Sequence, residues 1–251
     1  MSGMVEGKVV VVTGGSSGIG RSVCLRAAEE GAAAIVIASL REEPREGGRT
    51  VADELAERGV AHAFVRTDVT RPDDFNAVIE AADDFGGVDV LVTSAGISDS
   101  VDVLEVSPER MQRVMAVNFE GTVFACQAAA RSMIGRQVTG SIVTLSSVGG
   151  MRGFAHAATY SASKGAVRTF SYALADALGP HGIRVNVVHP GQVDTEMLRV
   201  EMRGGSPIRI PLGRKGMPEE IANLILFAAS DQASYLHGAS LVIDGGYSAV
   251  I

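Results

Sequence analysis

The 251-residue sequence contains no tryptophan, and aromatic residues make up only 5% of it. Its hydrophobic fraction is nevertheless 46%, so the core must be built mainly from alanine, valine, isoleucine and leucine. Small aliphatic residues of this kind are typical of parallel sheets that helices cover on both faces. The length suits one large α/β domain or two small ones.

Cysteine is also scarce, and the two present are Cys24 and Cys126. Two cysteines in a chain of this length indicate neither a disulfide framework nor a metal site. We therefore expect both thiols to be reduced and structural, and we expect no metal ion.

Long apolar runs and basic tracts are missing as well. No apolar run approaches the roughly 18 residues of a membrane span, and the first residues, MSGMVEGK, lack the apolar stretch of a signal peptide. The net charge is −7 and no basic patch is evident, which argues against a nucleic-acid partner. These absences predict a cytoplasmic protein that binds neither membranes nor nucleic acids.

Short apolar runs alternate with helical patterns along the whole chain. Strands are expected at 8–12, 33–38, 63–66, 88–92, 140–145, 183–188 and 239–243, and helices at 19–30, 50–58, 73–85, 108–134 (one long helix or two abutting ones), 159–178 and 218–229. This order predicts an α/β fold with a doubly wound, Rossmann-like parallel sheet of about seven strands and helices on both faces, in three α/β/α layers. We expect a single domain over 1–251, with the irregular stretch 192–216 as a substrate lid.

The first expected strand runs directly into a glycine-rich turn, TGGSSGIG at 13–20. Gly14 permits a tight turn, while Gly18 and Gly20 allow close approach of the backbone to a pyrophosphate and of the helix to the strand. The helix that follows offers free N–H groups at its N-terminus to phosphates. The segment predicts a nucleotide site that also includes Ser16, Ser17 and Ile19.

A second motif, YSASK, places Tyr160 and Lys164 four residues apart on one face of an expected helix. Taken alone, such a pair is more typical of a helix surface. An ammonium at ~5 Å, at an effective dielectric constant of ~20, favours the phenolate by roughly 3 kcal/mol. This is about two pKa units, and the positive charge of an oxidised nicotinamide would act in the same direction. The pKa of the phenol would then fall from its ordinary ~10 to roughly 7 or 8, which suits general acid–base catalysis.

These motifs, in this order, resemble the classical short-chain dehydrogenase/reductase family, and the resemblance covers essentially the whole chain. Besides the two motifs above, it rests on Asp68-Val69, SAG at 94–96, Asn118, Ser147 and PGQVDT at 190–195. One departure is Ser94, where the family usually has asparagine. A serine hydroxyl makes fewer hydrogen bonds between neighbouring strands, which affects local stability more than chemistry.

The resemblance implies four catalytic residues. Tyr160 would be the general acid–base, and Lys164 its partner with a second contact to the nicotinamide ribose. Ser147 would orient the substrate, and Asn118 would belong to a proton relay. Within the segment LSSV either Ser146 or Ser147 could serve, and the family's spacing of thirteen residues before the tyrosine selects Ser147.

The resemblance also implies contacts to the cofactor. Asp68 and the Val69 backbone would bind the adenine, and the Val193 backbone and the Thr195 hydroxyl would bind the carboxamide and a phosphate. Asp68 and Thr195 could instead cap helices. The remaining positions that the family motifs bring to this site are Ala95, Gly96, Pro190 and Gly191.

The cofactor preference depends on the end of the second expected strand. NAD-preferring members carry an acidic residue there that binds the ribose 2′-hydroxyl, and this sequence has Ser39. Arg41, followed by Arg45 and Arg49, could pair with a 2′-phosphate. Alternatively, these arginines form a solvated face with Glu42, Glu43 and Glu46. We expect NADP(H), with NAD(H) as the alternative.

We expect a largely apolar pocket for a small ketone or secondary alcohol. Its wall would include Ser98, Gly149, Gly150, Phe154, His156, Gln192, Met197, Leu198 and Met202. Arg199, Arg203 and Arg209 would either recognise an anionic substrate group or be solvated lid residues.

The predicted activity is hydride transfer between a nicotinamide cofactor and a ketone/alcohol pair. The alternatives are a 3-oxoacyl-thioester reductase of the same family and a non-catalytic nucleotide-binding regulator, because fold does not fix function. A sugar-nucleotide epimerase or dehydratase would require a longer C-terminal domain. Family resemblance further implies a homotetramer formed through the helices at 110–134 and 159–178 and the C-terminal strand.

Overall fold

The computed structural model describes residues 3–201 and 209–249. Its strands are β1 (Val9–Thr13), β2 (Ala34–Ser39), β3 (Ala61–Arg66), β4 (Val90–Thr93), β5 (Gly140–Leu145), β6 (Ile183–Pro190) and β7 (Ser240–Ile243). They form a seven-stranded sheet in the order β3-β2-β1-β4-β5-β6-β7, and all six neighbouring pairs are parallel. The strand order reverses between β1 and β4, which confirms the predicted doubly wound sheet.

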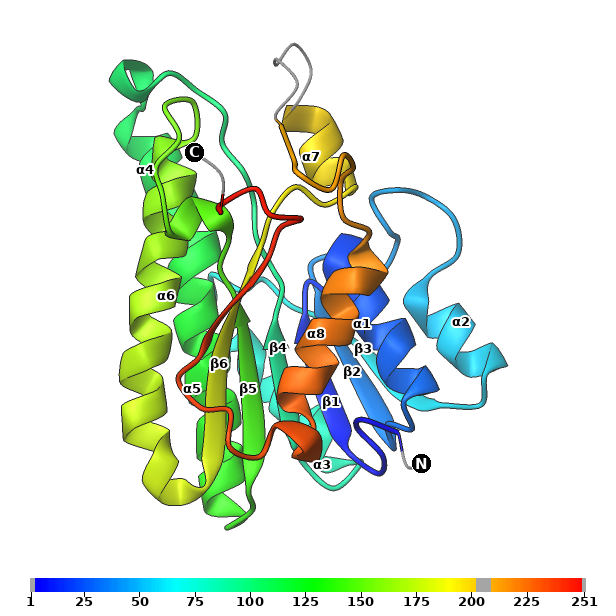
Figure 1. Ribbon diagram of the computed structural model, residues 1–251. Helices are drawn as coiled ribbons and strands as arrows, with labels where there is room; N and C mark the ends of the chain where they lie inside the picture. The colour runs from blue at the N-terminus through cyan, green and yellow to red at the C-terminus, as the bar shows by residue number, and fades with distance from the viewer. Residues whose placement is uncertain (1–2, 202–208, 250–251) are drawn as a thin grey trace.

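Helices cover both faces of the sheet (Figure 1). One face carries α1 (Gly18–Glu29), α2 (Val51–Glu57) and α8 (Pro218–Ala229), and the other carries α3 (Asp74–Asp83), α4 (Pro108–Met115), α5 (Gly121–Gly135) and α6 (Ala158–Leu178). The short helix α7 (Glu196–Glu201) follows β6 at the carboxyl edge of the sheet. Short 3₁₀ turns lie at Val103–Glu105, Val148–Gly150, Gly179–His181 and Asp231–Ala233.

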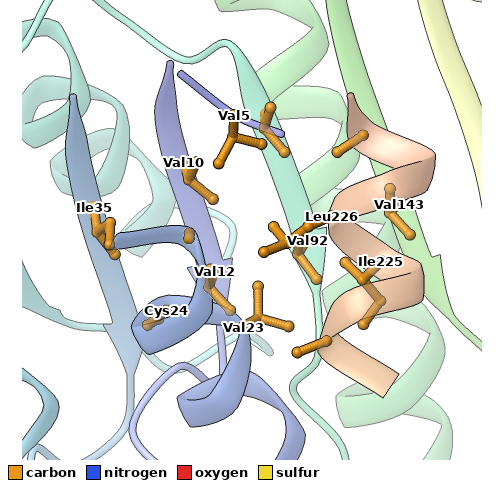
Figure 2. Packing of buried hydrophobic residues seen from close by; sticks show 14 of the residues in the cluster. Val5, Val10, Val12, Val23, Cys24, Ile35, Val92, Val143, Ile225 and Leu226 are labelled. Carbon is orange, nitrogen blue, oxygen red and sulfur yellow. The ribbon is translucent and has the colours of Figure 1, made fainter. Parts of the chain in front are cut away.

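The sheet is buried on both sides, and alternate residues of each central strand belong to different cores. Val10 and Val12 of β1 pack with Val23 of α1 and with Ile225 and Leu226 of α8 (Figure 2). The intervening residues of β1 face a second core beneath α3, α5 and α6. Burial on both faces explains why these strands are continuous apolar runs in the sequence.

The long helical region that begins at Pro108 is a single element. A π-helical turn, Ala116–Glu120, joins α4 to α5 without a break. From the first turn of α5, the Thr122 hydroxyl donates to the carbonyl oxygen of Asn118 in this wider turn (2.8 Å). Such turns often occur at functional sites, and this one contains the predicted relay residue Asn118.

The structure also bears on the expectations about membrane spans, the two cysteines and the lid. In residues 3–201 and 209–249 no helix is long and apolar enough to cross a membrane, and the cytoplasmic location stays a prediction. Cys24 and Cys126 are both unpaired and buried, and burial raises the pKa of each thiol. Met202 and Arg203 of the predicted pocket and lid lie outside the described residues.

Candidate active site

A cavity of about 500 Å³ lies at the carboxyl ends of strands β1 to β6. Parallel strands end at the same edge of a sheet, so segments far apart in the sequence meet there. Most of the predicted site residues line this cavity. They are Gly14, Ser16, Ser17, Gly18, Ile19, Ser39, Arg41, Asp68, Val69, Ala95, Gly96, Ser147, Tyr160, Lys164, Pro190, Gly191, Val193, Thr195, Met197 and Leu198.

The glycine-rich turn leaves its backbone uncovered, and side chains at its glycines would collide with neighbouring atoms. Gly14 has a φ of +66°, and a Cβ atom there would lie 2.8 Å from the Cα atom of Ala95. A Cβ atom at Gly20 would lie 2.3 Å from the carbonyl oxygen of Gly14, so Gly20 supports the turn and does not line the cavity. The bare backbone ahead of α1 therefore fits a dinucleotide diphosphate.

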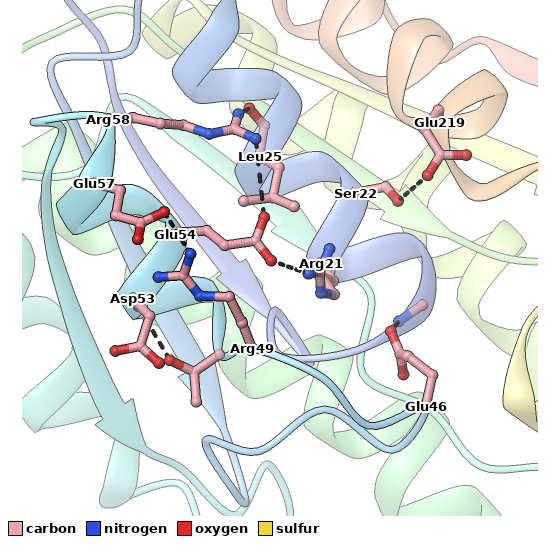
Figure 3. A network of polar contacts seen from close by, with 12 residues as sticks. Arg21, Ser22, Leu25, Glu46, Arg49, Asp53, Glu54, Glu57, Arg58 and Glu219 are labelled. Atoms are coloured by element: carbon pink, nitrogen blue, oxygen red, sulfur yellow. Dashed lines mark hydrogen bonds and ion pairs between the residues drawn. The ribbon is translucent and has the colours of Figure 1, made fainter.

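At the end of β2, Ser39 is buried and its hydroxyl is paired with that of Ser16 (2.8 Å). Neither residue places a carboxylate beside the expected ribose. Arg41 and Arg45 line the cavity. Arg49 does not: its guanidinium is paired with Glu57 (2.5 Å) (Figure 3). Two of the three arginines thus remain candidates for a 2′-phosphate.

Capping was the alternative for Asp68 and Thr195, and only Thr195 makes a contact of that kind. It precedes α7, and its hydroxyl oxygen accepts from the backbone N–H of Leu198 at 3.5 Å. An Asp68 carboxylate oxygen accepts from the backbone N–H (3.0 Å) and the hydroxyl (2.7 Å) of Thr70, within the loop before α3. Both residues line the cavity.

Lys164 and Tyr160 lie together on the first turns of α6. The Lys164 ammonium donates to the carbonyl oxygen of Leu145 (2.8 Å) and lies 5.9 Å from the centre of the Tyr160 ring. Only 6% of Lys164 is exposed, and burial lowers its pKa from 10.5 to about 8. A group with that pKa is still mostly protonated at pH 7, so it presents a desolvated positive charge to its neighbours.

The two serines after β5 have different surroundings. The Ser146 hydroxyl donates to the carbonyl oxygen of Lys164 (2.7 Å), which ties β5 to α6. The Ser147 oxygen accepts from the backbone N–H of Gly149 (3.0 Å), so its own O–H hydrogen stays available to donate. A Cβ atom at Gly149 would lie 3.4 Å from Cε1 of Tyr160 and 3.5 Å from Oγ of Ser147. Ser147 and Tyr160 therefore border the same small gap.

Asn118 is fully buried behind this group and does not line the cavity. Its Nδ2 donates to the carbonyl oxygen of Ile97 (2.9 Å) and to the Ser163 hydroxyl (3.0 Å), and its Oδ1 accepts from the Ile97 N–H (2.8 Å). Ser163 in turn donates to the carbonyl oxygen of Tyr160 (2.7 Å). A Cβ atom at Gly96, which lines the cavity, would lie 3.4 Å from Oδ1 of Asn118, so the amide lies close behind this part of the cavity wall.

Sequence reasoning missed a buried histidine behind Ser147. His189 Nδ1 lies 3.1 Å from the carbonyl oxygen of Ser147, and its Nε2 lies 2.6 Å from the Ser240 hydroxyl. A carbonyl oxygen only accepts, so Nδ1 carries the proton. Burial lowers the pKa of His189, and the neutral ring then accepts from Ser240 through Nε2. This chain fixes the backbone of Ser147 from β7, and a lone histidine in a strand pattern gave no signal of it.

The predicted substrate pocket is divided in the structure. Met197 and Leu198 line the 500 Å³ cavity, whereas Gly149, Gly150 and Phe154 line an adjacent cavity of about 540 Å³. A C-terminal residue, Tyr247, stacks on Phe154 with the ring centres 6.3 Å apart. No sequence pattern linked these two aromatic residues, which are far apart in the chain.

The other predicted pocket residues line neither of these cavities. His156 is exposed, and its carbonyl oxygen accepts from the backbone N–H of Val101 (3.0 Å). Gln192 accepts through its carbonyl oxygen from the Gly216 N–H (2.9 Å). The Ser98 hydroxyl is buried and finds no hydrogen-bond partner within the described ranges.

Glu46 lines the 500 Å³ cavity, whereas in the sequence it was considered only as part of a solvated face. Its Oε1 accepts from the backbone N–H of Gly18, the first residue of α1, at 2.9 Å (Figure 3). Further lining residues not singled out as cofactor contacts include Leu40, Thr67, Thr70, Ile97, Arg113, Val117, Leu145 and Glu196.

Lys164→Met should stabilise the protein at neutral pH by removing the buried charge. Because the folded-state pKa is about 8 and the ordinary value is 10.5, the unfolded chain binds this proton more tightly. Below pH 8 the buried ammonium therefore lowers the free energy of unfolding of the wild type by about 3 kcal/mol. The variant is relieved of this but loses the hydrogen bond to Leu145, which contributes about 1 kcal/mol. We expect the variant's free energy of unfolding to be about 2 kcal/mol higher at pH 7.

That difference should shrink as the pH rises from 8 to 10.5, where the lysine of the folded wild type becomes neutral first. Urea denaturation of both proteins at pH 7 and pH 10 measures it. A difference that stays constant between these two pH values would show that Lys164 is not desolvated.

The geometry agrees with three comparisons with known proteins. A family model described as "Enoyl-(Acyl carrier protein) reductase" matches residues 13–248. The chain is 38% identical to an L-rhamnose 1-dehydrogenase (NAD(P)(+)) of a Sphingomonas species, with 97% of each chain covered. It is 37% identical to a cyclopentanol dehydrogenase of a Comamonas species, covering 98% of this chain and 99% of that one.

Solved structures give the same result. A crystal structure of a short-chain type dehydrogenase/reductase from Mycobacterium marinum superposes with a TM-score of 0.90 at 37% identity, covering 97% of this chain and 96% of the other. The fold, the order of the motifs and these similarities together assign the chain to the short-chain dehydrogenase/reductase family.

Proposed function

We propose that this protein interconverts a small cyclic secondary alcohol and its ketone, with Tyr160 as the general acid–base and NADP(H) as the preferred cofactor. Its family relatives are NAD(P)-dependent dehydrogenases that act on alcohols, so a nicotinamide-dependent oxidoreductase is the general activity. The observation that carries the residue assignment is the buried Lys164 ammonium beside Tyr160, with the Ser147 hydroxyl across the same gap.

In this proposal Tyr160 is the residue that transfers the proton to and from the substrate oxygen. During oxidation its phenolate oxygen takes the hydroxyl proton of the alcohol, and during reduction the phenol returns a proton to the carbonyl oxygen. The desolvated charge of Lys164 favours the phenolate and so brings the phenol closer to the range in which it can act in both directions. Ser147 donates its available O–H to the substrate oxygen, where negative charge develops.

The cofactor supplies the hydride acceptor or donor when it is bound. The turn from Gly14 to Gly20 would hold its diphosphate, Asp68 and Val69 its adenine, and Val193 and Thr195 its nicotinamide end. The cavity and the uncovered backbone of the glycine-rich turn support this placement. For Asn118 we propose the relay role implied by the resemblance, and its bonds to Ile97 and Ser163 add the positioning of α6.

The substrate class is inferred from two observations. Cyclopentanol and L-rhamnose, named for two relatives, are both small molecules that can present a hydroxyl group on a ring. In this chain Met197 and Leu198 contribute apolar side chains to the cavity that Tyr160 also lines, which suits a ring carbon better than a charged group. We propose the segment 192–216, which contains both residues, as the substrate lid, within a single domain spanning 1–251.

Tyr160→Phe should abolish turnover with little effect on cofactor binding. Removing the hydroxyl deletes the proton donor and acceptor, so kcat should fall by about 10³-fold on cyclopentanol, cyclopentanone and related ring substrates. Steady-state kinetics and a fluorescence titration of NADPH measure the two effects. Tyr235→Phe, the same change at a fully exposed position, is the control and should leave both unchanged.

Three results would contradict this assignment. A kcat of Tyr160→Phe within tenfold of the wild type would remove Tyr160 from the mechanism. Faster turnover of 3-oxoacyl thioesters than of ring ketones would favour the thioester reductase. Cofactor binding without turnover of any substrate would favour a regulator.

The NADP(H) preference is supported by the pair Arg41 and Arg45 at the cavity and by the absence of a carboxylate at Ser39. Arg41→Ala or Arg45→Ala should therefore weaken NADPH binding about tenfold, or about 1.4 kcal/mol, and leave NADH binding unchanged. Arg49→Ala removes the same charge away from the cavity and is the matched control. Tighter NADH binding by the wild type, or equal losses for both cofactors, would contradict the preference.

We also propose that four copies of the chain assemble, as the family resemblance implies. β7 is an edge strand, and Val242 on it is 42% exposed, which supports an interface at this edge. Sedimentation equilibrium should report a tetramer, and Val242→Glu should shift it towards smaller species. A wild-type monomer at micromolar concentration would contradict the proposal.

A further inference from the structure

The N-terminus of α1 is capped by a carboxylate from a different loop. The helix supplies no cap of its own, since the Ser17 side chain makes no capping bond and the first turn contains no acidic residue. Instead, Gly18 donates its N–H to Glu46 (2.9 Å), and the Ser17 hydroxyl oxygen accepts from the backbone N–H of Arg45 (2.9 Å). Two hydrogen bonds thus fasten the loop after β2 to the glycine-rich turn, and Figure 3 shows the one that Glu46 makes.

The loop presents Glu46 on a tight turn. Gly47 donates its N–H to the carbonyl oxygen of Pro44 (3.1 Å), which places Arg45 and Glu46 at the two central positions. Pro44 is buried and anchors the turn on one side. On the other side, Gly47 and Gly48 have φ values of +77° and +93°, a backbone conformation that glycine adopts without strain. The carboxylate is held by the shape of the loop and by its bond to α1.

Glu46 therefore sits at the phosphate end of the cofactor cavity, which it lines together with Arg41 and Arg45. The expected lid segment also lies close to the turn. A Cβ atom at Gly18 would lie 3.3 Å from Cγ2 of Thr195. Glu46 also adds to the raised pKa of Arg199 in α7, after the larger effects of Asp194 and Glu196. Both the Glu46 loop and the segment that contains Thr195 thus contact the glycine-rich turn.

We propose that Glu46 is an internal competitor for the cofactor diphosphate and thereby a determinant of cofactor affinity. The N–H groups at the start of a helix bind anions, and the diphosphate expected at this turn needs the groups that Glu46 now uses. Two anions at one helix start repel each other, so cofactor binding displaces the carboxylate. The inference rests on the proposed function, because it requires a nicotinamide cofactor at this turn.

The competition has a quantitative consequence. Only molecules whose Glu46 has left the turn bind the diphosphate, and the apparent Kd exceeds the intrinsic Kd by the inverse of that open fraction. Because the backbone N–H of Arg45 is bonded to the Ser17 hydroxyl oxygen in the same closed arrangement, displacement of Glu46 loosens the loop at both bonds. Removing the carboxylate should therefore tighten the binding of NADPH and NADH alike.

The test compares Glu46→Ala with Glu43→Ala, which removes the same charge from the same loop at a position that does not line the cavity. In fluorescence titrations, Glu46→Ala should lower the Kd of both NADPH and NADH three- to tenfold, and Glu43→Ala should change neither by more than twofold. Glu46→Gln, which keeps an oxygen acceptor and loses the charge, should lie between the wild type and Glu46→Ala. In the cofactor-free protein, hydrogen exchange at the Gly18 amide should be at least tenfold faster in Glu46→Ala and unchanged in Glu43→Ala.

Unchanged or weaker binding of both cofactors by Glu46→Ala and Glu46→Gln would overturn the inference and leave the proposed function standing. A loss confined to NADH would also overturn it, because Glu46 would then be a ribose ligand. If the wild type bound neither cofactor, the proposed function and this inference would fail together.

Discussion

The site depends on the burial of one positive charge. The Lys164 ammonium is almost inaccessible to solvent, its hydrogen-bond acceptor is a backbone carbonyl, and the described residues include no carboxylate within salt-bridge distance of it. A carboxylate in contact with the ammonium would neutralise its charge and weaken its electrostatic effect on other groups. Without one, the field acts on the nearest group that can become negative, which is the phenol of Tyr160. The cost in stability and the proposed catalytic benefit therefore have the same origin.

The sheet and its helices make this burial possible. α6 approaches the segment after β5 closely because a Cβ atom at Gly150 would lie only 2.6 Å from the Lys164 carbonyl oxygen, and no side chain is present there. Ser146 bonds the same carbonyl oxygen, and Asn118 ties α6 to the segment after β4 through Ser163 and Ile97. These contacts join α6 to the segments after β5 and after β4, whose carboxyl ends meet at the same edge of the parallel sheet. They hold the backbone that carries Lys164 in place.

The sequence predicted the features whose physical signal is local. The glycine spacing at 13–20 follows a buried strand, and the i, i+4 spacing of Tyr160 and Lys164 lies on a strongly helical segment, so both were readable without a structure. The seven strands and the doubly wound parallel sheet followed from the alternation of apolar runs and helices along the chain. In the two motifs the deciding residues are close together in the sequence.

What was missed depends on contacts between distant segments. Glu46 belongs to a run of charges typical of a solvated loop, and only the folded chain shows its carboxylate on Gly18. His189 and Tyr247 likewise act through partners on other strands or at the far end of the chain. The predicted pocket was divided between two cavities because the sequence shows which residues follow each strand but not where their side chains point.

The pKa of Lys164 in the cofactor-free protein tests the central claim most directly. The chain contains three lysines, Lys8, Lys164 and Lys215, so NMR titration of isotopically labelled lysine side chains resolves each one, and Lys164→Met assigns the signal. A desolvated ammonium predicts a Lys164 signal that titrates near pH 8, well below the ordinary lysine value of 10.5. A Lys164 pKa near 10.5 would show that the charge is solvated, and would contradict the account of how Tyr160 is activated.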